Sequence, residues 1–289
     1  MCCMASEVAS TQVWMRHFKD KLRIRFSSHH AKCGQCLRHR LIIRKLGHCP
    51  EALRAQRAQL DKHLARQHRD RQVYWFERAR SRLCATNLGS YVMTAIIDSM
   101  DQAKHAWPRS VAMQAKCFNS WSRPRLVSTT MLCHGQLALM CLSPHYVTAN
   151  GSRTCEVLSA GLSMLQKKQF DTRLCWLNLQ GDNCSKELKN ATVLQMVSLN
   201  IALGQLKGSD VSFLASGHSH EDIDAFFSIV RGWLERQPEL WTPCSFQASL
   251  KEFLKDPAHR PYEPMREVVM MSQYRDWQLG LRSLFPYCV

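Results

Sequence analysis

Between Tyr91 and Gln237 the sequence alternates short apolar runs with longer amphipathic segments, and no other feature constrains the fold as strongly. Short apolar runs bounded by turn residues, such as the His134–Gly135 pair, indicate strands of a sheet. Segments with apolar residues three or four positions apart indicate helices that bury one face. The predicted order is β-β-β-α-β-α-β-α, which indicates an α/β fold with a mixed sheet. We predict strands at residues 91–97, 125–133, 136–142, 172–180 and 211–215, helices at 152–168, 185–206 and 220–237, and inward-facing Ile223, Phe227, Val230 and Leu234 in the last helix.

The segments on either side of this core differ from it in composition. From Glu51 to Leu83, Ala, Leu, Gln, Arg and His dominate and Gly and Pro are absent, which predicts one long basic helix. Six prolines interrupt the chain from Pro238 onward, so we expect an extension that wraps on the core without a sheet of its own. The predicted domains are an N-terminal tail at residues 1–28, a Cys/His segment plus the basic helix at 29–85, the core at 86–237 and the extension at 238–289.

The net charge of the chain is +16 at neutral pH, and the excess of basic residues lies near the N-terminus. Residues 1–85 contain 19 Lys and Arg against 6 Asp and Glu, whereas residues 86–289 contain 20 against 17. A surplus of positive charge attracts phosphate backbones whatever their base sequence. We therefore expect DNA as a partner and the N-terminal part of the chain as the part that contacts it.

Cysteine use and apolar run lengths indicate the compartment. Fourteen cysteines are spread from Cys2 to Cys288 without the close, regular spacing of a small secreted domain, and no leader-like segment precedes them. The longest apolar runs, near residues 137–142 and 268–271, are much shorter than the roughly 20 residues that cross a bilayer. We therefore expect an intracellular protein with no membrane partner.

Three acidic residues lie where strands end or a helix begins. Asp98 ends the first predicted strand, Asp182 follows the fourth, and Asp224 lies in the first two turns of the last helix. In an open sheet, groups beyond the ends of neighbouring strands meet at one edge. Two-metal phosphodiester chemistry needs carboxylates around two divalent ions roughly 4 Å apart, and Mg²⁺ prefers oxygen ligands. The sequence therefore predicts a Mg²⁺ or Mn²⁺ site formed by Asp98, Asp182 and Asp224.

Other polar residues near these acids have competing explanations. Asp222 is best explained as an acid at a helix N-terminus, where the helix dipole favours it. Histidines in a glycine-led loop more often cap or pack than bind, although they can also orient water or contact phosphate. The alternative or neighbouring candidates for the acidic site are therefore Asp101, Asn183, His218, His220 and Glu221.

Cys33 and Cys36 form a Cys-x-x-Cys pair ahead of the basic helix. Zinc binds four ligands in a tetrahedron, and such a pair combined with ligands from a helix is a typical arrangement. Two free thiols in a polar loop explain the pair about equally well. The other candidate ligands are His29, His30, His39, His48, Cys49, His63 and His68.

The predicted basic helix is also a candidate DNA-contacting element. Arg66 and Arg69 are among its nine Lys and Arg residues, and three aromatic residues follow at 74–76. We expect the aromatic side chains to dock the helix on the sheet, since stacking on bases is the less common role. Lys104 and Lys189 are candidate phosphate contacts near the acids, although exposed lysines and basic helix faces are usually only hydrated.

Several short motifs resemble those of mobile-element proteins. The segment IDAFFSIVRGWL, residues 223–234, resembles the N-x-I-E-x-F-W-x-x-L-K helix of bacterial insertion-sequence and mariner-type transposases. The predicted element order, with acids at these points and this helix at its end, resembles the ribonuclease-H-like fold of DDE/DDD transposases and integrases. The stretches DSMDQAK, RPRL, HG, LQGDN followed by KELKN, and GHSHEDID also resemble a transposon-derived eukaryotic domain that carries versions of DGMDQAK and GHTHEDID. This likeness covers about residues 29–240.

The resemblance implies roles for particular residues. Asp98, Asp182 and Asp224 become the metal ligands, with Asp at the third position where many relatives have the longer Glu, and Arg231 lies near the basic position of the motif helix. Related domains show H-x-x-C-x-x-C followed by a helical His. This pattern implies a structural zinc held by His30, Cys33, Cys36 and His63.

The resemblance also implies a function. We expect a DNA-processing protein that performs two-metal phosphodiester hydrolysis or strand transfer, acts in the nucleus, and assembles as a dimer or larger complex. The alternative is a catalytically silent, domesticated module, stabilised by zinc, that binds DNA or assembles with other proteins.

Overall fold

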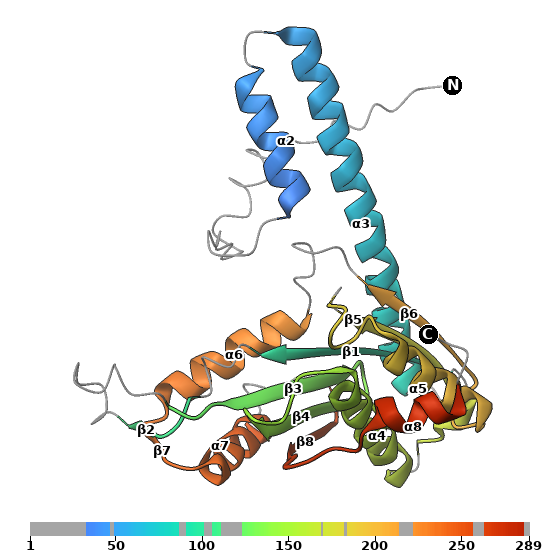
Figure 1. The fold of residues 1–289 in the computed structure, drawn as a ribbon, viewed down its shortest axis with the longest axis vertical. Coiled ribbons are helices and arrows are strands. Elements are labelled where there is room, and N and C mark those ends of the chain that lie inside the picture. Colours follow the sequence, from blue (N-terminus) through green and yellow to red (C-terminus); the bar gives the residue numbers. More distant parts are fainter. Residues whose placement is uncertain are drawn as a thin grey trace. The chain divides into compact units, whose positions relative to one another are not determined.

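The structure is a computed structural model that describes residues 33–46, 49–86, 91–100, 106–110, 123–168, 170–181, 184–213, 222–256 and 263–285. These residues all belong to one compact unit, residues 33–289. The described part contains seven α-helices and eight strands (Figure 1). None of its helices is long and apolar enough to cross a membrane.

Six strands form one mixed sheet, which confirms the predicted α/β class. The strand order is β6-β5-β1-β3-β4-β8. β1 lies in the middle, antiparallel to β3 and parallel to β5, and the β3–β4 hairpin extends the sheet on one side. The strand bounds are β1 Val92–Met100, β3 Leu126–Cys133, β4 Leu137–Pro144, β5 Trp176–Gly181, β6 Gly208–Phe213 and β8 Met265–Met270; β2 Arg109–Ser110 pairs separately with β7 Glu239–Leu240.

Each face of the sheet is covered by its own set of helices. Because successive residues of a strand point to opposite faces, Ala95 and Ile97 of β1 join one hydrophobic core while Ile96 and Met100 join the other. The first core includes α4 Gly151–Lys167, α5 Ala191–Ala202 and α8 Trp277–Leu284, and the second includes α6 Asp222–Arg236 and α7 Pro243–Lys255. All four residues predicted to face inward from α6 are buried: Ile223, Phe227, Val230 and Leu234.

The predicted basic helix is present and longer than expected. α3 runs from Pro50 to Thr86 and pairs with α2, Gly34–Lys45 (Figure 1). The C-terminal part of α3 lies against β1, where its contacts are polar: Ser81 Oγ accepts from Thr94 N at 3.0 Å and donates to the His134 carbonyl at 2.8 Å. Of the three aromatic residues expected to dock the helix, only Tyr74 is buried, whereas Trp75 and Phe76 are exposed.

The turn between β3 and β4 requires glycine. Gly135 has a φ of +81°, a conformation that side chains rarely adopt. A Cβ atom at this position would lie 2.9 Å from both the Ala85 Cβ and the Arg82 Cα of α3. The His134–Gly135 pair, predicted as a tight turn, therefore also lets the hairpin pack closely against α3.

The helix predicted at residues 185–206 begins later than expected. α5 starts at Ala191, because the side chain of Asn190 accepts a hydrogen bond from Val193 N at 3.1 Å and caps the helix. Glu187, expected in an acidic first turn, instead lies in the preceding turn. This difference frees its side chain to reach β1 and α4.

The proline-interrupted extension is more regular than its composition indicated. Two of the prolines that the structure describes stand at the starts of elements: Pro243 is the first residue of α7, after the capping residue Thr242, and Pro264 immediately precedes β8. β8 pairs with β4 in parallel and so becomes an edge strand of the main sheet. The extension thus contributes to the core sheet as well as covering it.

Candidate functional site

The first candidate site is a metal centre formed by Cys33, Cys36 and His63. One ligand atom from each residue lies within 4.8 Å of the other two. Cys33 immediately precedes α2, Cys36 lies in its first turn, and His63 comes from α3, with 3.4 Å between Cys33 Sγ and His63 Nε2. Two thiols and an imidazole are a donor set that zinc prefers. The structure therefore brings together three of the four predicted zinc ligands.

Burial affects how this centre would take up metal. Burial, followed by the neighbouring Cys33 thiol, raises the pKa of Cys36 above its ordinary value of 9.0. Zinc binds the thiolate, so uptake of the ion displaces protons, and binding therefore weakens as the pH falls. The two cysteines are 8% and 7% exposed, which limits the access of water to the site.

The remaining zinc candidates divide into two groups. The ring of His68 contacts Trp75 edge-on at 6.0 Å. The ring of His39 lies beside the cluster, 6.2 Å from that of His63, with its Nδ1 paired with Gln56 Nε2 at 2.5 Å, so its Nε2 stays a candidate ligand atom. Cys49 is exposed. The predicted fourth ligand His30, and the alternatives His29 and His48, lie outside the described residues.

The second candidate site is the end of β1 that carries Asp98. Asp98 Oδ1 accepts a hydrogen bond from the amide of Ser99 at 2.7 Å, which orients the carboxylate. A pocket of about 240 Å³ adjoins it, and its walls include Asp98, Ser99, Thr129 and Glu187. Asp98 and Glu187, from separate parts of the chain, therefore both line this pocket.

Glu187 is a residue of this pocket that the sequence reasoning missed. Its Oε2 accepts hydrogen bonds from Arg153 Nη2 and from Ser99 Oγ, each at 3.1 Å. Within the part of the chain that the structure describes, Oε1 accepts none. One carboxylate oxygen is thus held in place while the other remains available. Glu187 could have been identified as a candidate because it lies five positions after Asp182. The predicted helix instead assigned it to a helix N-terminus.

Arg153 supports this arrangement from inside the protein. It lies in the first turn of α4 and is 1% exposed. Burial lowers the pKa of its guanidinium below the ordinary value, and Glu187 opposes that shift. A buried cation needs a close anion. Glu187 therefore has a structural role in addition to its place in the pocket.

Asp224 belongs to the helix that packs on the sheet beside β1. It lies in the first turn of α6, and that helix packs against β1 through Ile223 and Phe227. By strand alternation, Asp98 belongs to the same sheet face as Ile96 and Met100, the face that α6 covers. Asp182, the third predicted ligand, and its neighbour Asn183 lie outside the described residues.

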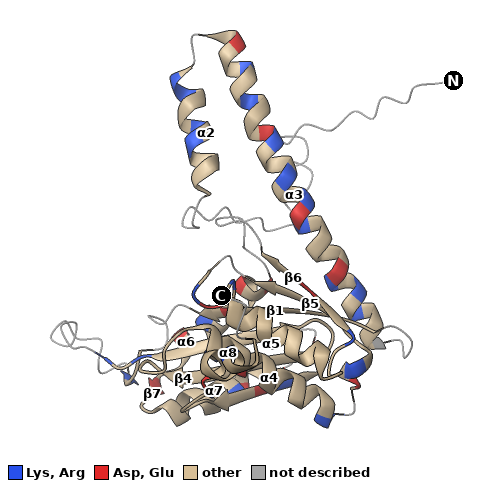
Figure 2. Ribbon diagram, turned by 45° about the vertical axis from the view of Figure 1, so that its right-hand side comes forward, with Lys and Arg blue, Asp and Glu red and all other residues tan. Residues whose placement is uncertain are grey.

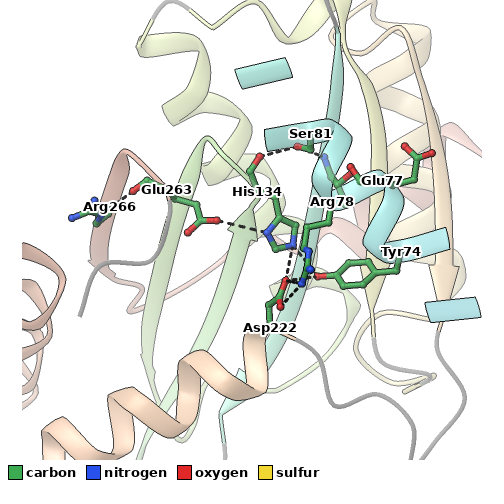
Figure 3. A network of polar contacts seen from close by, with 9 residues as sticks. Tyr74, Glu77, Arg78, Ser81, His134, Asp222, Glu263 and Arg266 are labelled. Carbon is green, nitrogen blue, oxygen red and sulfur yellow. Dashed lines mark hydrogen bonds and ion pairs between the residues drawn. The ribbon is translucent and has the colours of Figure 1, made fainter. Parts of the chain in front are cut away.

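Asp222 has a more specific role than the expected charge at a helix N-terminus. Figure 3 shows its carboxylate facing Arg78 of α3, whose Nη1 donates to both oxygens at 2.5 and 2.6 Å. Tyr74 donates to Asp222 Oδ2 at 3.5 Å, and its hydroxyl lies 2.8 Å from His134 Nε2. On the far side of the imidazole, His134 Nδ1 lies 3.6 Å from Glu263 Oε1. Asp222 therefore joins α6 to α3 and to the β3–β4 turn.

The other predicted contact residues are less closely tied to either site. Arg66 and Arg69 are exposed on α3, where Figure 2 shows several blue basic positions along the helix. Arg231 is paired with Glu235 on the same helix, with 2.6 Å between Nε and Oε1. Lys189 Nζ lies 5.7 Å from the centre of the Phe213 ring. Asp101, Lys104, His218, His220 and Glu221 lie outside the described residues.

These features define a mixed α/β protein with a Cys/His cluster able to hold a metal such as zinc. A family model described as "Domain of unknown function (DUF7869)" matches residues 125–281, and the chain belongs to this family. The matched region includes Glu187, Asp222 and Asp224 but neither Asp98 nor the Cys/His cluster. Comparisons with curated proteins and with solved structures found no match.

Proposed function

We propose that this chain is a transposase-derived DNA-processing protein that uses Asp98, Asp182 and Asp224 in two-metal phosphodiester hydrolysis or strand transfer. One observation carries the proposal. Asp98 lies on the central strand of the sheet, and α6, which bears Asp224, packs across that same strand. Two of the three acids therefore come from elements in direct contact.

The order of the elements supports the same proposal. β1, β3, β4, α4, β5, α5, β6 and α6 follow one another in the β-β-β-α-β-α-β-α order of the ribonuclease-H-like resemblance, with only the short β2 and a 3-10 turn added. β5 is parallel to β1 and directly beside it. Asp182 comes one residue after the end of β5, and its position in the chain therefore favours the β1–β5 edge.

The chemistry follows from the ligand types. Divalent ions held by these carboxylates would activate an attacking water or 3′-hydroxyl and stabilise the leaving oxygen. Asp98 is already oriented by the Ser99 amide. Mg²⁺ and Mn²⁺ suit such an oxygen-rich set. The exposed basic residues of α3 would hold the DNA backbone.

The Cys/His cluster supports a separate, structural role for zinc. Cys33, Cys36 and His63 join the start of α2 to the middle of α3. With His30 as the fourth ligand, a zinc ion would fix the α2–α3 pair and the basic surface on it. Zinc sites closed by four protein ligands contribute folding energy and leave no position open for substrate.

A second candidate function is a catalytically silent module that only binds DNA or assembles with other proteins. The observation that favours it is the location of the Cys/His cluster and the exposed Arg66 and Arg69 together on α2 and α3. These elements need no carboxylate chemistry to bind a polyanion.

A nicking assay on supercoiled DNA with Mg²⁺ or Mn²⁺ separates the two functions. We expect cleavage by the unchanged chain and by the control Glu252→Gln, which removes an exposed carboxylate on α7. Asp98→Asn and Asp182→Asn should each abolish cleavage. Absence of cleavage by every protein, with DNA binding retained, would establish the silent module instead.

A further inference from the structure

The Arg78–Asp222 pair is half-buried and borders a buried group of polar residues. His134 is 1% exposed and Glu263 is 2% exposed. His134 Nδ1 makes no hydrogen bond in the described part of the chain and has the Glu263 carboxylate 3.6 Å away. The His134 backbone is fixed as well, because its carbonyl accepts from Ser81 Oγ at 2.8 Å. The imidazole is therefore held on the same helix face that supplies Arg78.

Polar contacts orient the first turn of α6 in a way that its apolar contacts cannot. Ile223 and Phe227 pack into the core, but hydrophobic burial has no preferred direction. Charge-assisted hydrogen bonds are short and directional. The Arg78–Asp222 pair therefore sets the rotation of this turn about the helix axis.

We propose that Arg78 and His134 are positioning residues for Asp224. By fixing Asp222 they determine where the carboxylate of Asp224, two residues farther along the same turn, is presented to the end of β1. Neither residue is assigned a contact with metal or DNA. This inference rests on the proposed function, because it requires Asp224 to hold a metal ion.

The network also unites motifs that were separate in the sequence. His134 comes from the HG turn, Asp222 from GHSHEDID, and Arg78 from the basic helix (Figure 3). Their meeting accounts for the presence of a half-buried arginine on the side of α3 that faces Asp222. Arg78 thus has a different role from Arg66 and Arg69.

The test uses the full chain and two independent measurements. Arg78→Gln removes the charge that holds Asp222, and Arg78→Lys retains it. Arg80→Gln is the matched control, since Arg80 is two residues away, half exposed and paired only loosely with Glu77 at 3.5 Å. Hydrogen exchange of the α6 and α7 amides is measured without added Mg²⁺ or Mn²⁺, and Mn²⁺ affinity is measured by electron paramagnetic resonance.

We expect Arg78→Gln to weaken Mn²⁺ binding about tenfold, as loss of an outer partner of a metal ligand does. It should also accelerate hydrogen exchange in the first two turns of α6 and leave the exchange of α7 unchanged. Arg78→Lys should retain most of the Mn²⁺ affinity and most of the exchange protection of α6. His134→Asn should act in the same direction as Arg78→Gln. A lower melting temperature with unaltered Mn²⁺ affinity in Arg78→Gln would overturn the inference and leave the proposed function standing. Absence of Mn²⁺ binding by the unchanged chain would overturn both.

Discussion

Arg153 Nη2 donates to Glu187 Oε2 at 3.1 Å and thereby holds, from within the core, a carboxylate that lines the pocket beside Asp98. The same nitrogen donates to Ser99 Oγ at 3.1 Å, so the residue next to Asp98 is tied to the same guanidinium. Arg153 therefore connects the start of α4 with the turn before α5, through Glu187, and with the end of β1, through Ser99. A change at either residue should therefore affect both the stability of the fold and the geometry of the pocket.

Replacing the buried partner tests the stability of this pair. Arg153→Met should lower the free energy of unfolding by about 3 kcal/mol, because it leaves Glu187 without its cation. Adding Glu187→Gln should recover part of that loss. Urea denaturation of the two single variants and the double variant measures the coupling.

An exposed ion pair provides the control for that measurement. Arg173 and Asp171 form a contact of 2.9 Å at the surface, with the arginine side chain 68% exposed. Arg173→Met should lower the free energy of unfolding much less than Arg153→Met does, because solvent screens an exposed pair. Equal losses in Arg153→Met and Arg173→Met would contradict a structural role for the buried pair.

The contact between Glu156 of α4 and the segment before α8 should make stability depend on pH. Burial raises the pKa of Glu156, but hydrogen bonds from Arg275 and Trp277 outweigh that effect and hold it below the ordinary 4.5. A lowered pKa in the folded state stabilises the protein above the unfolded value, and this contribution is lost as the pH falls through the folded value.

The variant Glu156→Gln isolates that contribution. Its free energy of unfolding should be lower than that of the unchanged chain at pH 7, by an amount that stays constant down to about pH 4.5 and shrinks below it. Urea titrations from pH 3 to pH 7 measure the difference. A difference that grows toward acidic pH would have the wrong sign for this explanation.

Metal analysis tests the Cys/His cluster. The chain purified without chelators should contain one zinc per molecule, and Cys36→Ser should lose it. Cys49→Ser is the matched control, because Cys49 is exposed and outside the cluster. Chelator should lower the melting temperature of the unchanged chain but not that of Cys36→Ser. A zinc content near zero in the unchanged chain would contradict the proposed site.

The salt dependence of DNA binding tests the basic face of α3. Each phosphate contact contributes about 0.9 to the slope of log affinity against log salt. The double change Arg66→Gln and Arg69→Gln should therefore reduce that slope by about 2. Lys251→Gln, an exposed change on α7, should leave it unaltered. Fluorescence anisotropy at several salt concentrations measures both, and equal slopes in all three proteins would exclude this face as the contact.

Local sequence patterns predicted the helices and strands well where the spacing of apolar residues reflects burial of one face. The apolar runs of β1, β3 and β4 gave the predicted strands, and the spacing of Ile223, Phe227, Val230 and Leu234 identified the buried face of α6. The Cys-x-x-Cys pair was recognisable because its spacing is a local pattern, whereas His63 was selected among several candidate histidines only by the family resemblance.

Long-range polar pairing could not be inferred in the same way. Glu187 was expected at a helix N-terminus, but Asn190 starts α5 later and the acid pairs with Arg153 instead. Asp222 was explained by the helix dipole, but Arg78, 144 residues earlier, binds its carboxylate. Both partners are charged residues that a sequence reading assigns to solvent.

The sequence by itself determined the α/β class, the order of the core elements and the Cys-x-x-Cys pair, because hydrophobic periodicity and the spacing of such a pair act over a few residues. Only the tertiary structure decided that Glu187 shares a pocket with Asp98 and that Asp222 is held by Arg78 and borders His134. Such pairings depend on which elements cover which face of the sheet, and strand order and helix docking set that relationship over the whole length of the chain.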